Sequence, residues 1–82
     1  MKRILLCTAD ESFSRGLARL LRAADYDVVT ADGTGGVDHI ERDAFDAVVT
    51  DLHMPGADGF AILDAVRAKA PQTPVIVSRR PP

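Results

Sequence analysis

The stretch AVVTDLHMPGADG, residues 47–59, decides the fold of this chain. It begins with apolar and β-branched residues, which are typical of a buried strand, and continues with proline, glycine and Asp-Gly, which are typical of turns. Asp51 stands where the first pattern changes into the second. The stretch therefore predicts a strand that delivers a carboxylate to one edge of a sheet, where it is available for chemistry.

Similar apolar runs occur before and after this stretch, and segments with helical periodicity separate them. In the first such segment, apolar residues recur at the spacing of one helix face while arginines occupy other positions. This alternation, with connections long enough for crossovers, predicts an α/β domain in which helices cover both faces of a parallel sheet. The predicted strands are residues 4–7, 27–31, 45–50 and 73–78, and the predicted helices are residues 13–24, 37–44 and 59–70, the last capped by Asp58 and stopped by Pro71.

The glycine-rich segment DGTGG, residues 32–36, predicts a turn between the second strand and the second helix. Glycine lowers helix propensity, so we expect that helix to be short and to begin at Val37. The segment lacks both the glycine spacing and the lysine of phosphate-cradling loops. A nucleotide-binding function of that kind is therefore excluded.

Chain length, composition and net charge limit the size of the domain and the kinds of partner that it can have. The 82 residues allow one domain with a modest core, and a net charge of -2 gives no electrostatic reason to expect nucleic acid or an anionic membrane as a partner. The apolar run after Lys2 and Arg3 is too short for a signal peptide or a membrane span. The single Cys7 lies within that run, so we expect a core residue in a protein of the reducing cytoplasm.

Two carboxylates follow strands that are predicted to lie in the same sheet. If residues 4–7 and 45–50 form neighbouring strands, Asp10 and Asp51 converge in one crevice at the carboxyl edge. Such a pair suits Mg²⁺, which also accepts phosphate oxygens, and it can make one carboxylate a nucleophile toward a phosphoryl donor. Asp10 also precedes a helix directly, so a capping role is an equal alternative.

Along nearly its whole length the chain resembles the receiver domain of two-component response regulators. The resemblance lies in residues 51–59, which are similar to the family's phosphoacceptor loop, and in residues 26–31, 45–49 and 73–77, which are similar to its second, third and fourth strands. It implies a flavodoxin-like, doubly wound parallel sheet and a cytoplasmic, non-enzymatic phosphorelay protein. Asp51 would accept the phosphoryl group from a sensor histidine kinase or phosphotransfer protein, and Mg²⁺ would bind Asp51, Asp10 and the backbone carbonyl of His53.

The chain also departs from the family pattern at several positions. Thr8 and Ala9 stand where the family has an acidic pair, so Asp10 would have to reach the metal from the next position. Ser78 lies one place before the family's phosphoryl-contacting hydroxyl, and Arg79 stands in that place. No counterpart of the lysine on the family's fifth strand is present. We therefore expect a truncated receiver of about four strands and three helices over residues 1–78, with a basic, proline-containing tail at residues 79–82.

The missing elements suggest a second function, that of a phosphorylation-independent interaction module. Without the family's last helices, we expect apolar residues on the central strands, such as Leu5, Leu6, Val48 and Val49, to lose cover and the fourth strand to form an open edge. Such a surface predicts a homodimer or pairing with another receiver domain. An enzymatic alternative, a phosphatase with an aspartyl-phosphate intermediate, is disfavoured because His53 stands where its general acid belongs.

Overall fold

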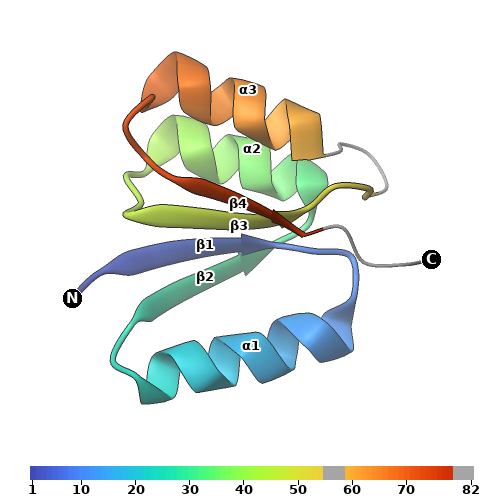
Figure 1. Ribbon diagram of the computed structural model, residues 1–82, viewed down its shortest axis with the longest axis vertical. Coiled ribbons are helices and arrows are strands. Elements are labelled where there is room, and N and C mark those ends of the chain that lie inside the picture. Colours follow the sequence, from blue (N-terminus) through green and yellow to red (C-terminus); the bar gives the residue numbers. More distant parts are fainter. Residues whose placement is uncertain (55–58, 79–82) are drawn as a thin grey trace.

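Four apolar runs of the chain form one parallel sheet. The computed structural model describes residues 1–54 and 59–78, and in this part the strand order is β2-β1-β3-β4. Helix α1 covers β1 and β2 on one face, while α2 and α3 pack together on the other face (Figure 1). The expected α/β architecture is thus confirmed. The elements are β1 (Arg3–Cys7), α1 (Glu11–Ala23), β2 (Asp27–Ala31), α2 (Gly33–Arg42), β3 (Ala47–Asp51), α3 (Gly59–Lys69) and β4 (Val75–Ser78).

The start of α2 corrects the prediction of a glycine turn. Helix α2 begins at Gly33, four residues before Val37, because the Asp32 side chain caps it by accepting a hydrogen bond from the Gly35 amide at 2.7 Å. Gly36 packs so closely against β1 that a Cβ atom there would lie 2.5 Å from Cys7 Sγ. The glycines therefore bring the helix close to the sheet.

Helix α1 also begins earlier than predicted, at Glu11 in place of Phe13, because Asp10 caps it. It ends at Ala23, and Asp25 then turns the chain toward β2 with a φ of 70°. Helix α3 ends at Lys69, one residue before the predicted end. The predicted capping residue of α3, Asp58, lies outside the described residues.

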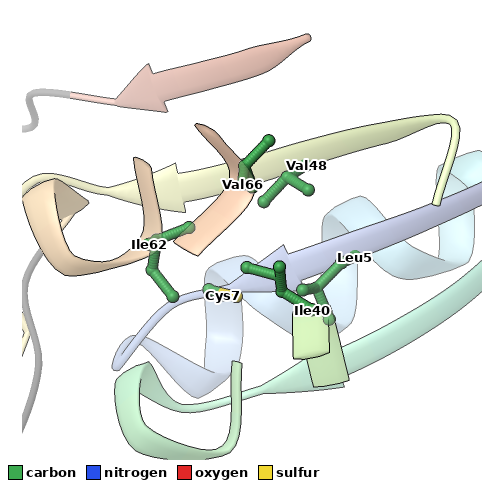
Figure 2. Close-up of a cluster of buried hydrophobic side chains, with 6 residues drawn as sticks. All are labelled: Leu5, Cys7, Ile40, Val48, Ile62 and Val66. Atoms are coloured by element: carbon green, nitrogen blue, oxygen red, sulfur yellow. The ribbon is translucent and has the colours of Figure 1, made fainter. Parts of the chain in front are cut away.

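The core consists of two clusters, one on each face of the sheet. Between the sheet and helices α2 and α3 lies the larger cluster, drawn in Figure 2, and between the sheet and α1 lies a smaller one. The buried members of the larger cluster are Leu5, Cys7, Ile40, Val48, Ile62 and Val66, and those of the smaller cluster are Leu6, Ala18 and Val28.

The predicted exposure of the central strands is wrong for three of the four residues named. Leu5, Leu6 and Val48 are at most 1% exposed, because α1 on one face and α2 with α3 on the other cover β1 and the adjoining part of β3. Val49 is half-buried. Apolar side chains are exposed on β4 instead, where Ile76 is 58% and Val77 is 38% accessible.

Strand β4 is an edge of the sheet in the described part of the chain, as expected. None of the described helices has the length and the apolar composition that crossing a membrane requires.

Candidate functional site

Asp51 ends β3, and its side chain is largely buried at the carboxyl edge of the sheet, with 8% of its surface exposed. The neighbouring strand β1 is in register with β3, so that Cys7 lies beside Thr50 and the next residue, Thr8, comes beside Asp51. The predicted adjacency of the first and third strands is therefore confirmed. It places Asp51 in the middle of the sheet edge, between the carboxyl ends of β1 and β4.

Thr8 contacts the Asp51 carboxylate directly. Its hydroxyl donates a hydrogen bond to Asp51 Oδ2, and it accepts one from the Asp10 amide at 3.1 Å. Thr8 is as buried as Asp51, and its own amide donates to the Ala31 carbonyl at 3.2 Å, which ties it to the end of β2. The sequence pattern did not predict this contact. The one signal for it is the position of Thr8 directly after a buried strand that neighbours β3.

Asp10 lies near Thr8, but its side chain caps α1. Its Oδ1 atom accepts a hydrogen bond from the Phe13 amide at 3.0 Å, and the side chain is exposed. The capping alternative is therefore seen in the structure. The proposed role of Asp10 as a metal ligand remains a prediction.

Ser78 lies on the side of Asp51 away from β1, and His53 follows Asp51 closely in the chain. Ser78 is the register partner of Asp51 on β4, and its carbonyl accepts a hydrogen bond from the Leu52 amide at 3.0 Å. His53 is exposed, two residues beyond Asp51. Arg79, which stands at the family's hydroxyl position, lies outside the described residues. The structure thus brings Asp51, Thr8 and Ser78 to one edge of the sheet.

Gly59, the first residue of α3, lies close to the end of β3. Its amide donates to the Leu52 carbonyl at 2.8 Å, and a Cβ atom at this position would lie 2.8 Å from the Asp51 carbonyl oxygen. Only glycine allows the first turn of α3 to approach the end of β3 so closely. In the sequence Gly59 stands out only as part of a turn pattern, which does not predict this contact.

The described residues fit a Mg²⁺ site only incompletely. Residues 1–54 and 59–78 hold no group of three or more His, Cys, Asp or Glu side chains placed to bind a metal. Asp51 brings a carboxylate to this edge, whereas Thr8 contributes a neutral hydroxyl and the Asp10 side chain caps a helix. The predicted role of the His53 carbonyl as a ligand remains a prediction. These residues therefore provide fewer carboxylates than a Mg²⁺ site of this kind would use.

A groove of about 670 Å³ adjoins Thr8 on the α1 side of this edge. It carries both signs of charge, since Arg15 and Arg22 line it together with Glu11 and Asp32. The Arg22 guanidinium is already engaged, donating to the Val28 carbonyl at 2.9 Å. The groove therefore shows no preference for one sign of ligand charge.

Comparisons with known proteins agree with this geometry. The sequence model of the family described as "Response regulator receiver domain" matches residues 4–79. Among curated proteins, the chain is 36% identical over 75 residues to the transcriptional regulatory protein RprY of Bacteroides fragilis, covering 90% of this chain and 32% of that protein. It is 36% identical over 76 residues to the transcriptional activator protein PfeR of Pseudomonas aeruginosa, covering 92% of this chain and 25% of that protein. The chain thus spans about a third or less of these relatives.

Solved structures extend the likeness to the fold. The receiver domain of sensor histidine kinase PA1611 from Pseudomonas aeruginosa, which holds a magnesium ion in its active-site cleft, superimposes with a TM-score of 0.86 at 28% identity. The match covers 93% of this chain and 65% of that one. The chemotaxis protein CheY4 of Vibrio cholerae gives a TM-score of 0.86 at 29% identity, with 94% and 67% covered.

Proposed function

This chain belongs to the response regulator receiver domain family, and from that premise we propose that it accepts a phosphoryl group on Asp51 from a histidine kinase or a phosphotransfer protein. The family serves two-component signalling and is not a family of enzymes. The observation that carries the proposal is the position of Asp51, the last residue of a central strand at the carboxyl edge of the sheet. Ligands of doubly wound sheets bind at this edge.

The proposed reaction is a phosphoryl transfer between two side chains. One oxygen of the Asp51 carboxylate attacks the phosphorus of a phosphohistidine, an O–P bond forms, and the P–N bond breaks with its electron pair going to the imidazole nitrogen. The product is an aspartyl phosphate. Thr8 is placed to hold the other carboxylate oxygen during the attack, because its hydroxyl already donates to Asp51 Oδ2.

Phosphorylation would change the charge of the sheet edge. A phosphoryl group adds about 1.5 to 2 negative charges at neutral pH. Asp51 is buried beside Thr8 and opposite Ser78, so the new group has to be accommodated by these segments. The surface around the carboxyl ends of β1, β3 and β4 would then differ between the two states, which is how a receiver biases a partner.

Mg²⁺ is the cofactor that the family membership suggests for this reaction. In this chain Asp51, the His53 carbonyl and, after release from its cap, Asp10 would be its ligands. When bound, the ion would offset the repulsion between the carboxylate and the phosphoryl donor.

A cytoplasmic location also remains our expectation, in keeping with a single, free and buried Cys7.

A second function, that of an interaction module that needs no phosphate, is favoured by one specific observation. Asp51 is hydrogen-bonded to the Thr8 hydroxyl in a site where no carboxylate cluster is seen among the described residues. A module of this kind would pair with a second copy, another receiver domain or a kinase. The exposed Ile76 and Val77 on β4 offer a surface for such pairing.

The experiment that separates the two functions is chemical phosphorylation. The purified chain is incubated with acetyl phosphate and millimolar Mg²⁺, and intact mass spectrometry measures the fraction that carries one phosphoryl group. We expect labelling that Asp51→Asn abolishes. Asp46→Asn is the matched control, because Asp46 is an exposed carboxylate that directly precedes β3, at the end opposite to Asp51, and accepts a hydrogen bond from the Arg3 amide. An unlabelled wild-type chain would favour the interaction module.

A further inference from the structure

The hydrogen-bond chain through Thr8 fixes the direction of its hydroxyl. The oxygen accepts from the Asp10 amide at 3.1 Å, so the hydroxyl proton points to Asp51 Oδ2. Both Thr8 and Asp51 are 8% exposed, which keeps water from competing strongly for this bond. A bond between a hydroxyl and a carboxylate in such surroundings is stronger than one between neutral groups.

We infer that Thr8 is a positioning residue that takes the place of a metal-binding carboxylate, so that this crevice binds divalent cations weakly. The inference concerns the same site as the proposed function and rests on Asp51 being its functional residue. A hydroxyl brings no negative charge to the crevice. Hard divalent cations are selected by carboxylates, and affinity rises with the number of charged ligands.

The Thr8 bond also opposes cation binding through Asp51 itself. A cation that approached Oδ2 would meet the hydroxyl proton and would have to displace it. The displaced hydroxyl would then need another acceptor inside a buried site. Thr8 therefore lowers the affinity twice, first by lacking a charge and second by occupying one carboxylate oxygen.

Asp10 could replace the missing carboxylate only by giving up its cap, which weakens any cation site it joins. Its Oδ1 caps α1 through the Phe13 amide at 3.0 Å, and it would have to leave this bond to turn toward Asp51. Leaving the cap would break the hydrogen bond that Asp10 makes to the first turn of α1. The neighbouring backbone is held as well, because the Asp10 amide donates to Thr8.

The test is to put a carboxylate at position 8 and measure cation binding directly. Mn²⁺ is the probe, and electron paramagnetic resonance gives the concentration of the free ion in titrations of wild type, Thr8→Asp, Thr8→Val and Thr8→Asp/Asp51→Asn. We expect Thr8→Asp to bind at least about tenfold more tightly than wild type, because it adds a charged ligand beside Asp51. Thr8→Val frees Asp51 Oδ2 without adding a charge, so it should bind at most a few-fold more tightly than wild type. The double variant should lose the gain of Thr8→Asp.

The inference is overturned if wild type binds Mn²⁺ as tightly as Thr8→Asp, or if the gain survives in the double variant. Two adjacent carboxylates destabilise the chain without a cation, so thermal unfolding is a second measurement. Mn²⁺ should raise the Tm of Thr8→Asp but leave that of wild type nearly unchanged, since a ligand stabilises only the state that binds it. A parallel rise in both would contradict the inference. Neither measurement uses acetyl phosphate. A failure of the proposed phosphorylation can therefore be told apart from a failure of the inference about Thr8.

Discussion

Asp51 and Ser78 are register partners at the carboxyl ends of β3 and β4, and the Leu52 amide joins the two strands by donating to the Ser78 carbonyl at 3.0 Å. The pairing of β3 with β4 uses the backbone of Ser78 and not its side chain. We therefore expect the Ser78 hydroxyl to be able to contact a phosphoryl group on Asp51. We expect Ser78→Ala to change the free energy of unfolding by less than about 0.5 kcal/mol. It should lower the yield of acetyl phosphate labelling at Asp51 several-fold, measured by intact mass.

The matched control for Ser78 is Thr73, a hydroxyl residue just before β4 and remote from Asp51. Its Oγ1 donates to the Phe45 carbonyl at 3.3 Å. Thr73→Ala should lower stability by about 1 kcal/mol, the usual contribution of one such hydrogen bond, and leave labelling unchanged. Equal labelling of Ser78→Ala and wild type would remove Ser78 from the site.

Asp10 is predicted to act on stability through its cap. Asp10→Ala should lower the free energy of unfolding by about 1 kcal/mol in urea titrations, because the Phe13 amide loses its acceptor. Asp10→Asn keeps an acceptor oxygen and should cost much less. The two variants also test whether Asp10 is a metal ligand, because the asparagine side chain of Asp10→Asn can still cap the helix but carries no negative charge. If Asp10→Asn weakens Mn²⁺ binding more than about tenfold, Asp10 is a ligand as well as a cap.

Gly36 and Gly16 are two helical glycines with opposite surroundings. A Cβ atom at Gly36 would lie 2.5 Å from Cys7 Sγ and 3.0 Å from Ile62 Cδ1, whereas one at Gly16 would meet nothing within 4 Å. Gly36→Ala should therefore lower the free energy of unfolding by about 1 to 3 kcal/mol, because α2 has to move away from the sheet. Gly16→Ala should raise it by about 0.5 to 1 kcal/mol through helix propensity. A stabilised Gly36→Ala would mean that α2 lies farther from β1.

The sequence predicted the strands and their alternation with helices because these depend on local patterns. Residues 27–31 were predicted as a strand with the bounds that β2 has. The side-by-side placement of β1 and β3 at Asp51 was implied by the resemblance to the receiver family, because the alternation of strands and helices alone leaves the strand order open. The start of α2 was missed because the benefit of Gly36 is a contact with Cys7, which lies far away in the sequence. The role of Thr8 was missed for a similar reason, since its hydrogen bond spans 43 positions to Asp51.

The exposed edge of β4 is expected to promote self-association at high protein concentration. Ile76 is 58% exposed on this edge, and lysine on an edge strand opposes pairing with another strand. We expect Ile76→Lys to shift the sedimentation velocity distribution toward the monomer. Leu20→Lys is the control, because Leu20 is 70% exposed on α1, which has no strand edge. Equal monomer fractions in wild type and Ile76→Lys would exclude the β4 edge as the contact.

Cys7 is predicted to be unreactive in the folded chain. Its side chain is fully buried between the sheet and α2, and burial, with a smaller contribution from the Asp32 carboxylate, raises the pKa of the thiol from 9.0 to about 12. Only the thiolate is the nucleophile. Iodoacetamide should therefore modify Cys7 at pH 8 at least about a hundredfold more slowly in the native chain than in urea, as followed by intact mass.

The same shift predicts how stability depends on pH. Because the folded-state pKa of Cys7 is raised, its contribution is fully present below pH 9.0 and is lost as the pH rises from there toward about 12, where the unfolded chain releases the proton first. Urea titrations along this range should show a fall in the free energy of unfolding that is smaller in Cys7→Ala. The comparison with Cys7→Ala isolates the part of this fall that the thiol causes. Identical pH profiles in the two chains would mean that the thiol has the same pKa folded and unfolded.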